Sequence, residues 1–305
     1  MQRLKAIILT ITFILPIGTA TGEEIARPLK LIKALPVVFH ERVDPSGLTI
    51  RDKTLFTVSD KQDDTIFRIQ ITYGEAILVP HIKFRLSEPV AVRRIDFEGL
   101  TCDADGIFYL VSESLFRVLR VDPREDYASW ATPSVQACGK EAGLFQVINA
   151  NVEGIALVGR NQFVLCAERQ PRGIIEVDMN TTPYKIKAFK YDKTSLKLPE
   201  GRNLDFADLF FENQTLYVLQ RNSYVISKLV RNGQTFEEKD FWSYEAIETS
   251  EDLQYSNMEF GRGEGLCMDE DHIYVILDNN GDNRISDPDD RRPLLLIMQR
   301  PQETQ

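Results

Sequence analysis

One strand–turn–strand pattern recurs five times along the sequence, and this repeat restricts the fold more than any other feature. The copies begin at Ser46, Glu98, Glu153, Ala207 and Glu264. Successive starts are 52, 55, 54 and 57 residues apart. A near-constant period of this size is typical of repeat architectures, in which each repeat forms one supersecondary unit.

Each copy has the same internal order. A short apolar strand leads into a turn rich in Asp, Asn and Gly, such as DADG at 103–106. A strand rich in β-branched and aromatic residues follows, such as IFYLVS at 107–112, and then come further strand candidates. Four strands in such a length are typical of a β-propeller blade. We therefore predict an all-β protein, a single β-propeller of five four-stranded blades, with a sixth, degenerate blade as the alternative.

The last copy is short and ends with PLLLIMQRP at 293–301. The segment PLKLIKALPVVF at 28–39 precedes the first copy, so we expect it to supply the outer strand of the last blade and close the ring. A chain of 305 residues fits one large all-β domain, and no change in composition marks a linker. The propeller domain is assigned to residues 23–305.

Residues 1–22 have the features of a secretory signal peptide. Arg3 and Lys5 form a basic start, residues 6–17 are apolar, and small residues follow up to Gly22. The apolar run is shorter than the roughly 20 residues that a membrane span needs. We expect cleavage near 20–22 and a secreted or periplasmic location in a bacterium, with an uncleaved anchor as the alternative.

The formal net charge of the chain is −10, and loss of two basic residues with the signal peptide makes it more negative. This charge argues against a nucleic-acid partner, because phosphate binding needs a basic face. We expect a monomer with no membrane span after cleavage. The four cysteines form no C-x-x-C pair, and a disulfide between Cys102 and Cys138 is left open.

The repeat carries acidic residues at both outer ends of its first hairpin. An antiparallel hairpin brings these two ends together opposite its turn, so Glu98 is expected beside Glu113. The equivalent pairs in three other copies are Glu153 with Glu168, Glu264 with Asp278, and Ser46 with Asp60. Radial repetition would bring all these ends to one mouth of the central channel.

Several carboxylates at one mouth require a counter-ion, since two charges 4 Å apart repel by about 4 kcal/mol at an effective dielectric constant near 20. Calcium accepts 6–8 oxygen ligands from such groups. The predicted ligands are carboxylate or amide residues at the hairpin ends: Asp60, Glu98, Glu113, Glu153, Glu168, Asp208, Glu264, Asp278, Asn279 and Asn280. The alternative is that each Glu before a Gly bonds to neighbouring backbone amides, where the Gly marks a bulge or a close approach.

Four basic residues near the same ends are candidates for binding an anionic substrate, because Arg forms bidentate contacts with phosphate and carboxylate. They are Lys61, Arg169, Arg221 and Arg262. Balancing the acids is the alternative role. Glu153 and Glu264 are the candidate general bases. The sequence has no G-x-S-x-G or H-E-x-x-H motif, and its three histidines are scattered.

Four stretches, at 46–60, 151–178, 205–221 and 264–282, resemble the successive motifs of the phytase-like family, also called "esterase-like activity of phytase". Their pattern is similar to that of SdiA-regulated propellers. The resemblance implies a secreted bacterial β-propeller that binds calcium and acts as a phosphoesterase or esterase-like protein. Two departures are Ala207, where most copies have Glu, and Arg221, where an acid is usual.

Two functions follow from this interpretation. The first is calcium-dependent hydrolysis of a phosphate ester or related anionic ester. The second is a non-catalytic propeller that calcium stabilises and that binds a peptide, glycan or envelope partner, because a fold alone does not fix a function.

Overall fold

The computed structural model describes residues 24–233 and 235–302, so the predicted signal peptide lies outside the described residues. Strands dominate the structure, and most form four-stranded antiparallel meanders. The first comprises β3 (Pro45–Arg51), β4 (Thr54–Ser59), β5 (Thr65–Ile71) and β6 (Ala76–Lys83). The second comprises β7 (Phe97–Cys102), β8 (Phe108–Ser112), β9 (Arg117–Val121) and β10 (Ser129–Trp130).

The remaining strands follow the same order. The third meander comprises β11 (Val152–Gly159), β12 (Gln162–Ala167), β13 (Gly173–Asp178) and β14 (Lys185–Lys190). The fourth comprises β15 (Asp208–Glu212), β16 (Thr215–Gln220), β17 (Val225–Asn232) and β18 (Thr235–Ser243), with β1 (Arg27–Pro28) parallel to β18. The fifth comprises β19 (Gly263–Met268), β20 (His272–Leu277), β21 (Leu294–Gln299) and β2 (Lys30–Val38).

The N-terminal segment that we expected in the last repeat is β2, and it pairs antiparallel with β21. At its far end β2 also pairs parallel with β6, through Val37 and Val38. This second contact joins the fifth and first meanders into one eight-stranded sheet.

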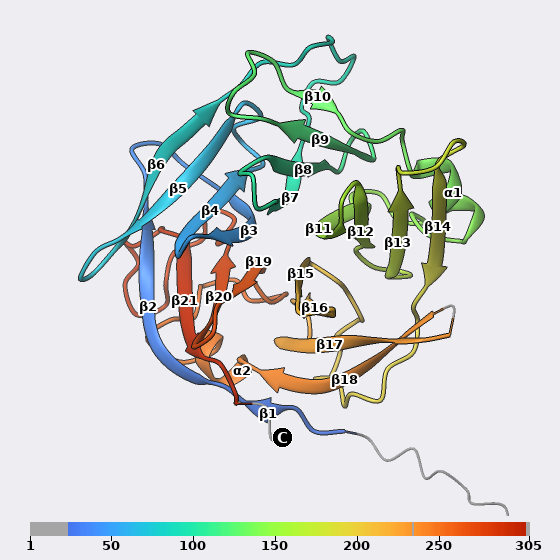
Figure 1. Cartoon of the computed structure of the whole chain (residues 1–305). Helices are drawn as coiled ribbons and strands as arrows, with labels where there is room; N and C mark the ends of the chain where they lie inside the picture. The colour runs from blue at the N-terminus through green and yellow to red at the C-terminus, as the bar shows by residue number, and fades with distance from the viewer. Residues whose placement is uncertain (1–23, 234, 303–305) are drawn as a thin grey trace, which may run out of the picture.

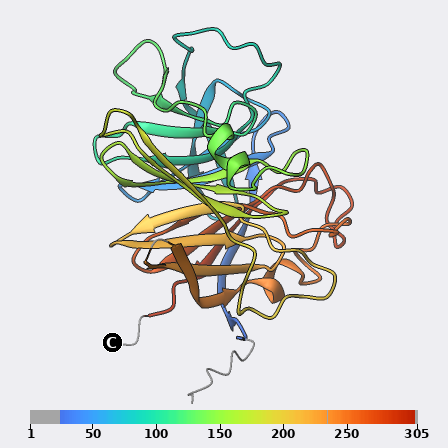
Figure 2. The same cartoon turned by 90° about the vertical axis from the view of Figure 1, so that its right-hand side faces the viewer.

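The first strand of every meander faces the centre of the molecule (Figure 1). Around this centre β3 contacts β7, β7 contacts β11, β11 contacts β15, β15 contacts β19, and β19 contacts β3. Seen from the side in Figure 2, the sheets lie one above another, and the red-orange connections of the last repeat extend at the right.

Apolar side chains fill the spaces between neighbouring sheets. The second strands, such as β8 and β12, are buried almost throughout because a sheet packs on each of their faces. Each neighbouring pair of sheets shares one hydrophobic cluster in the described residues. Representative members are Phe56 with Phe108, Tyr109 with Phe163, Cys166 with Val218, Leu219 with Val275, and Ile276 with Leu48.

In four of the five repeats a glycine follows the first residue and allows the inner strands to approach closely. A Cβ atom on Gly99 would lie 2.6 Å from the carbonyl oxygen of Glu153, and one on Gly154 would lie 2.5 Å from the Cα of Asp208. The strand register also shifts at this glycine, as between Phe97 and Gly99. The glycine therefore marks both a bulge and a close backbone approach, as the alternative interpretation of the sequence expected.

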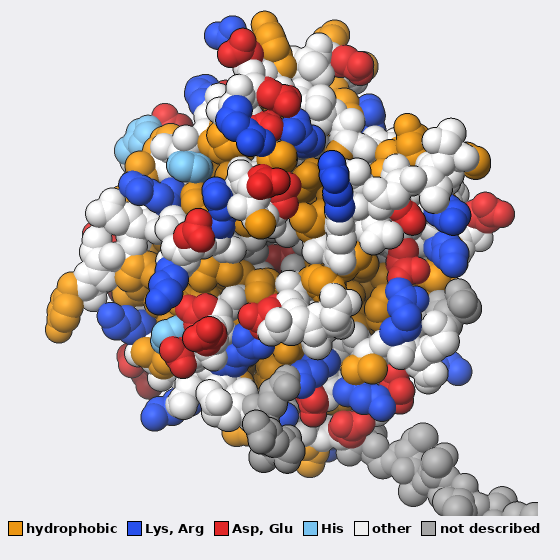
Figure 3. Space-filling view, viewed as in Figure 1, with side chains coloured by type: hydrophobic (Ala, Val, Ile, Leu, Met, Phe, Trp, Pro, Cys, Tyr) orange, Lys and Arg blue, Asp and Glu red, His pale blue; other side chains and the backbone are white. Residues whose placement is uncertain are grey.

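Two short helices, α1 (Gln136–Glu141) and α2 (Glu245–Glu248), lie in connections for which the sequence showed no helical periodicity. No helix in the described part of the chain is long and apolar enough to cross a bilayer. Cys102 and Cys138 are both free thiols, so they form no disulfide. On the face seen in Figure 3, basic side chains are scattered among acidic ones.

Candidate functional site

The two acidic ends of the hairpins meet in one cavity of about 210 Å³, which we call the acidic mouth. Its lining contains seven carboxylates and two arginines. The lining residues are Ser46, Asp60, Glu98, Glu113, Asn149, Glu153, Glu168, Arg169, Arg221, Glu264, Asp278 and Asn280.

Two sequence positions of the repeat supply most of this lining. One is the first residue of the repeat, which precedes the glycine of the close approach. The other is the residue directly after the second strand. The antiparallel pairing of β7 with β8 brings Glu98 and Glu113 to the same end, as expected from the hairpin. The structure thus brings together ten of the fourteen residues predicted for the site and leaves four outside the lining. Those four are Asp208, Asn279, Lys61 and Arg262.

Asp208 occupies the position that holds glycine in the other four repeats, and its side chain is fully buried. Its carboxylate accepts the backbone N–H of Leu48 at 3.3 Å, of Leu266 at 2.8 Å and of Leu209 at 2.8 Å. These donors come from three different inner strands. Burial raises the pKa of Asp208 well above its usual value, while the amide donors act in the opposite direction. Asp208 therefore binds the backbone of neighbouring repeats beneath the acidic mouth.

The other three residues also bind parts of the chain. The side-chain amide of Asn279 donates to the carbonyl oxygens of Asp282 at 2.6 Å and Arg291 at 2.9 Å. Arg262 is buried and pairs with Asp282 at 2.6 Å. Lys61 forms ion pairs with Asp60 and with Asp44. These contacts match the charge-balancing alternative for Lys61 and Arg262.

Arg221 lies inside the acidic mouth and neutralises one side of it. Its guanidinium pairs with both Glu168 and Glu264, and its Nε lies 3.5 Å from Oδ2 of Asp205. Arg169 also pairs with Glu168. Glu168 and Glu264 are thus compensated by basic groups of the chain itself.

The opposite side of the mouth has no such compensation. Glu98 and Glu153 form no hydrogen bond or ion pair with any other described residue, although Glu153 is only 7% exposed. Glu113 accepts the backbone N–H of Asn151 at 3.2 Å. Burial raises the pKa of Glu153 well above its usual value, and the charge of Glu98 raises it further. The pKa of Glu98 is also raised, by burial and then by the charge of Glu113.

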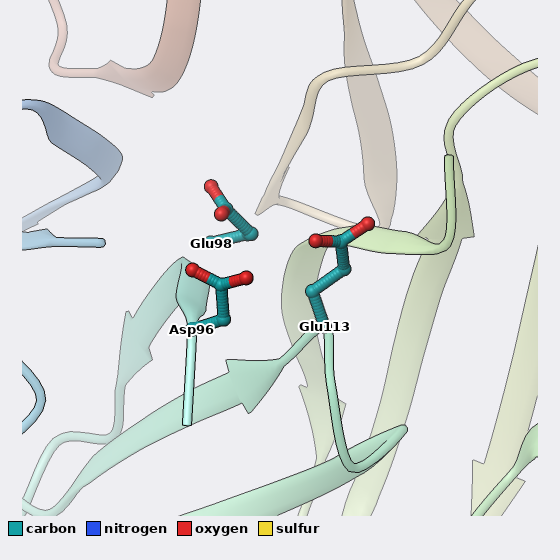
Figure 4. Close-up of side chains that lie close together, drawn as sticks. All are labelled: Asp96, Glu98 and Glu113. Atoms are coloured by element: carbon teal, nitrogen blue, oxygen red, sulfur yellow. The ribbon is translucent and has the colours of Figure 1, made fainter. Parts of the chain in front are cut away.

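A third carboxylate on this side, Asp96, was missed by the sequence analysis. One oxygen from each of Asp96, Glu98 and Glu113 lies within 4.8 Å of the others, and Figure 4 shows the three side chains directed into one space. The repeat gave no signal for it, because Asp96 precedes the repeated motif and its φ of 61° lies outside the extended conformation of a strand.

The oxygen-rich lining fits a hard divalent cation. Calcium is bound by carboxylates, amide oxygens and carbonyls at 2.3–2.6 Å, with 6–8 ligands in all. Two buried carboxylate oxygens of the mouth, Oδ1 of Asp60 and Oε2 of Glu168, have no hydrogen-bond partner in the described residues. Asp96, Glu98 and Glu113 would hold such an ion, with Glu153 beside them.

The raised pKa values predict that the metal-free protein loses stability as the pH increases. Burial raises the pKa of Asp205 to about 6 and that of Asp278 to about 8, above the value each carboxyl has in the unfolded chain. A carboxyl with a raised pKa stabilises the fold at low pH, and this contribution is lost as the pH rises through the folded pKa. Thermal unfolding with chelator at pH 5, 7 and 9 should show a loss of about 5 kcal/mol across this range, at about 1.4 kcal/mol for each pH unit between pH 5 and the folded pKa of each group.

Added calcium should reverse that loss, because a bound cation favours the ionised carboxylates. Asp44, whose pKa is lowered by its bonds to Arg42 and Lys61 against the opposing effect of burial, is already ionised at pH 5 and does not oppose the trend. If the free energy of unfolding stayed constant or increased from pH 5 to 9 without calcium, the raised pKa values of Asp205 and Asp278 would be contradicted.

The inner strands, the apolar layers between sheets and the acidic mouth together define a protein of β-propeller type. The chain belongs to the phytase-like family, described as "esterase-like activity of phytase", whose model matches residues 45–281. No curated protein sequence matches this chain.

Solved β-propeller structures are similar in fold. The glutaminyl cyclase of Myxococcus xanthus is 14% identical with a TM-score of 0.54, and the alignment covers 90% of this chain and 96% of that one. The PQQ-bound aldose sugar dehydrogenase of Streptomyces coelicolor is 10% identical with a TM-score of 0.50, covering 89% and 97%. At such identities the similarity establishes the fold alone.

Proposed function

We propose that this protein is an exported, calcium-dependent hydrolase of phosphate esters or related anionic esters, acting at the acidic mouth of a closed five-bladed propeller. One observation carries the proposal: seven carboxylates line a single cavity with only two arginines, and Glu98 and Glu153 form no hydrogen bond or ion pair with another described residue. The cyclic order of inner-strand contacts and the five interlayer clusters support the five-bladed ring.

The residues of the mouth divide between holding the cation and binding the substrate. A divalent cation bound here would supply Lewis-acid polarisation of the ester's phosphoryl oxygen. Arg169 and Arg221 line the same cavity and would contact the anionic group. The side chain of Arg169 is 30% exposed, which allows it to meet a ligand entering from solvent.

Glu153 is better suited than Glu264 to be the general base. Glu264 is held by Arg221, whereas the carboxylate of Glu153 has no hydrogen bond or ion pair in the described part of the chain and can accept a proton from water. Burial raises the pKa of Glu153, which makes its carboxylate a stronger base than an exposed glutamate. The remaining wall is polar, which suits a charged ester better than an apolar one.

The test is hydrolysis of a panel of phosphate and carboxylate esters by the purified mature protein, with calcium or with chelator. We expect release of phosphate that stops on chelation, and a loss of about 100-fold in kcat for Glu153→Gln. The matched control is Asp105→Asn in an exposed turn, which should retain full activity. Absence of hydrolysis across the panel with calcium bound would contradict the enzymatic function.

A non-catalytic propeller remains the second candidate, and the contacts of Arg221 favour it. A guanidinium that already joins Glu168 and Glu264 stabilises the mouth without any substrate. In that case calcium would raise the melting temperature, but neither the wild type nor Glu153→Gln would hydrolyse an ester. A peptide or glycan partner would bind the calcium-loaded protein.

A further inference from the structure

Arg221 follows the second strand of the fourth repeat, where the other four repeats place a carboxylate. The equivalent residues are Asp60, Glu113, Glu168 and Asp278, and all of them line the acidic mouth with Arg221. A positive side chain therefore occupies one position of an otherwise acidic ring. This substitution makes the two sides of the mouth electrostatically different.

The contacts of Arg221 fix its guanidinium in place. Its side chain is only 16% exposed, and its partners Glu168 and Glu264 are 1% and 12% exposed. Asp205, which is fully buried, lies on its Nε side. Separating such a buried group from its partners leaves uncompensated charges, which costs several kcal/mol. The guanidinium thus acts as a permanent cation on this side.

The side across the mouth contains a group of carboxylates without a permanent cation. Oxygen atoms of Asp96, Glu98 and Glu113 approach within 4.8 Å of one another. Independently, Glu153 is more than nine-tenths buried, lines the same cavity and has no hydrogen bond or ion pair among the described residues. A buried carboxylate without a partner indicates that a ligand of positive charge completes this side.

The remaining two acids of the mouth have partners of their own. Asp60 pairs with Lys61, and Asp278 accepts the backbone N–H of Asn280 at 2.9 Å. Among the described residues, the two carboxylates of the mouth with no hydrogen bond or ion pair are therefore Glu98 and Glu153, which come from the second and third sheets.

We infer that the acidic mouth binds one divalent cation at Asp96, Glu98 and Glu113, beside the unpartnered Glu153, and that Arg221 takes the place of a second cation on the opposite side. This inference rests on the cation of the proposed function and specifies its number and place. An anionic group of the substrate is then bound between the ion and the guanidinium. Arg221 is a positioning and specificity residue, since it selects a ligand that needs one metal ion and one guanidinium.

The experiment is calorimetric titration of the metal-free mature protein with calcium at pH 7. The wild type should bind one ion. Arg221→Gln frees Glu264 and leaves Glu168 with Arg169 alone, so it should bind a second ion and bind the first about ten-fold more tightly, because a nearby positive charge is lost. Arg221→Lys keeps the charge and should bind one ion. The matched control is Arg160→Gln, which removes an exposed arginine outside the mouth and should also bind one.

The outcomes separate the two proposals. A wild type that binds no calcium overturns both the cation of the proposed function and this inference. A wild type that binds two ions, or an Arg221→Gln protein with one ion and unchanged affinity, overturns this inference and leaves the proposed hydrolase intact.

A second pair of variants decides the question if Arg221→Gln fails to fold. Glu98→Gln should abolish binding of the single ion, since Glu98 belongs to the uncompensated side. Glu264→Gln removes a carboxylate that pairs with Arg221, so the ion should still bind. Equal loss of calcium in both variants would place the ion at the centre of the mouth and overturn the inference.

Discussion

Replacing Asp208 with glycine, the residue that the other four repeats have at this position, is expected to lower the free energy of unfolding by about 3–5 kcal/mol. The carboxylate accepts backbone N–H groups of Leu48, Leu209 and Leu266, and all of them are buried at the axis. Without the carboxylate these donors have no partner, and each unsatisfied buried group costs about 1–3 kcal/mol. Urea unfolding followed by circular dichroism measures the change.

Glycine also increases the flexibility of the unfolded chain, which costs about 1 kcal/mol at any ordered position. Asp105→Gly, in an exposed turn, provides that baseline. If Asp208→Gly were no more destabilising than Asp105→Gly, the carboxylate would contribute nothing to the axis, and the glycine of the repeat would serve equally well in the fourth sheet.

Arg172→Met is expected to destabilise the protein by about 3–5 kcal/mol. The guanidinium is completely buried and contacts Glu238 through two bonds, of 3.1 and 2.9 Å. It also donates to Gln220 Oε1 at 2.6 Å, so it joins the third sheet to the fourth. The large loss comes from the charge of Glu238, which would remain buried without a counter-ion. Thermal and urea unfolding of the purified variant check this prediction.

The double variant Arg172→Met/Glu238→Leu should regain much of that stability, because no unpaired charge remains. Lys239→Met on the same strand is the matched control: its ion pair with Glu237 is about half exposed on each side and should contribute less than about 1 kcal/mol. A double variant as unstable as Arg172→Met alone would show that packing, rather than charge, determines the effect.

The repeat period and the alternation of turns with apolar strands were sufficient to predict an all-β fold of β-propeller type. They were also sufficient to predict that Glu98 and Glu113 lie together, because strand pairing alone determines which ends of a hairpin meet. The placement of the N-terminal segment beside β21 followed from counting the strands of the last repeat.

Other features depend on contacts between repeats, which a period cannot specify. The sequence shows Asp208 where glycine is usual, but the amides that it binds belong to strands far away in the chain. In the same way, the pairing of Arg221 with Glu168 and Glu264 depends on how three different sheets are oriented around the centre of the molecule. Asp96 lies outside the repeated motif, so only the folded chain showed that it faces Glu98 and Glu113.

The double pairing of β2 has a consequence for the order of folding. Leu35 pairs with Leu295, which lies 260 residues later in the chain, and Val37 pairs with Ala76 on the other side. During synthesis one edge of β2 stays unpaired until nearly the whole polypeptide has left the ribosome. Contacts of such long sequence separation slow folding, and unpaired edges promote association between chains. The last step of folding is therefore expected to be the slowest and the most prone to aggregation.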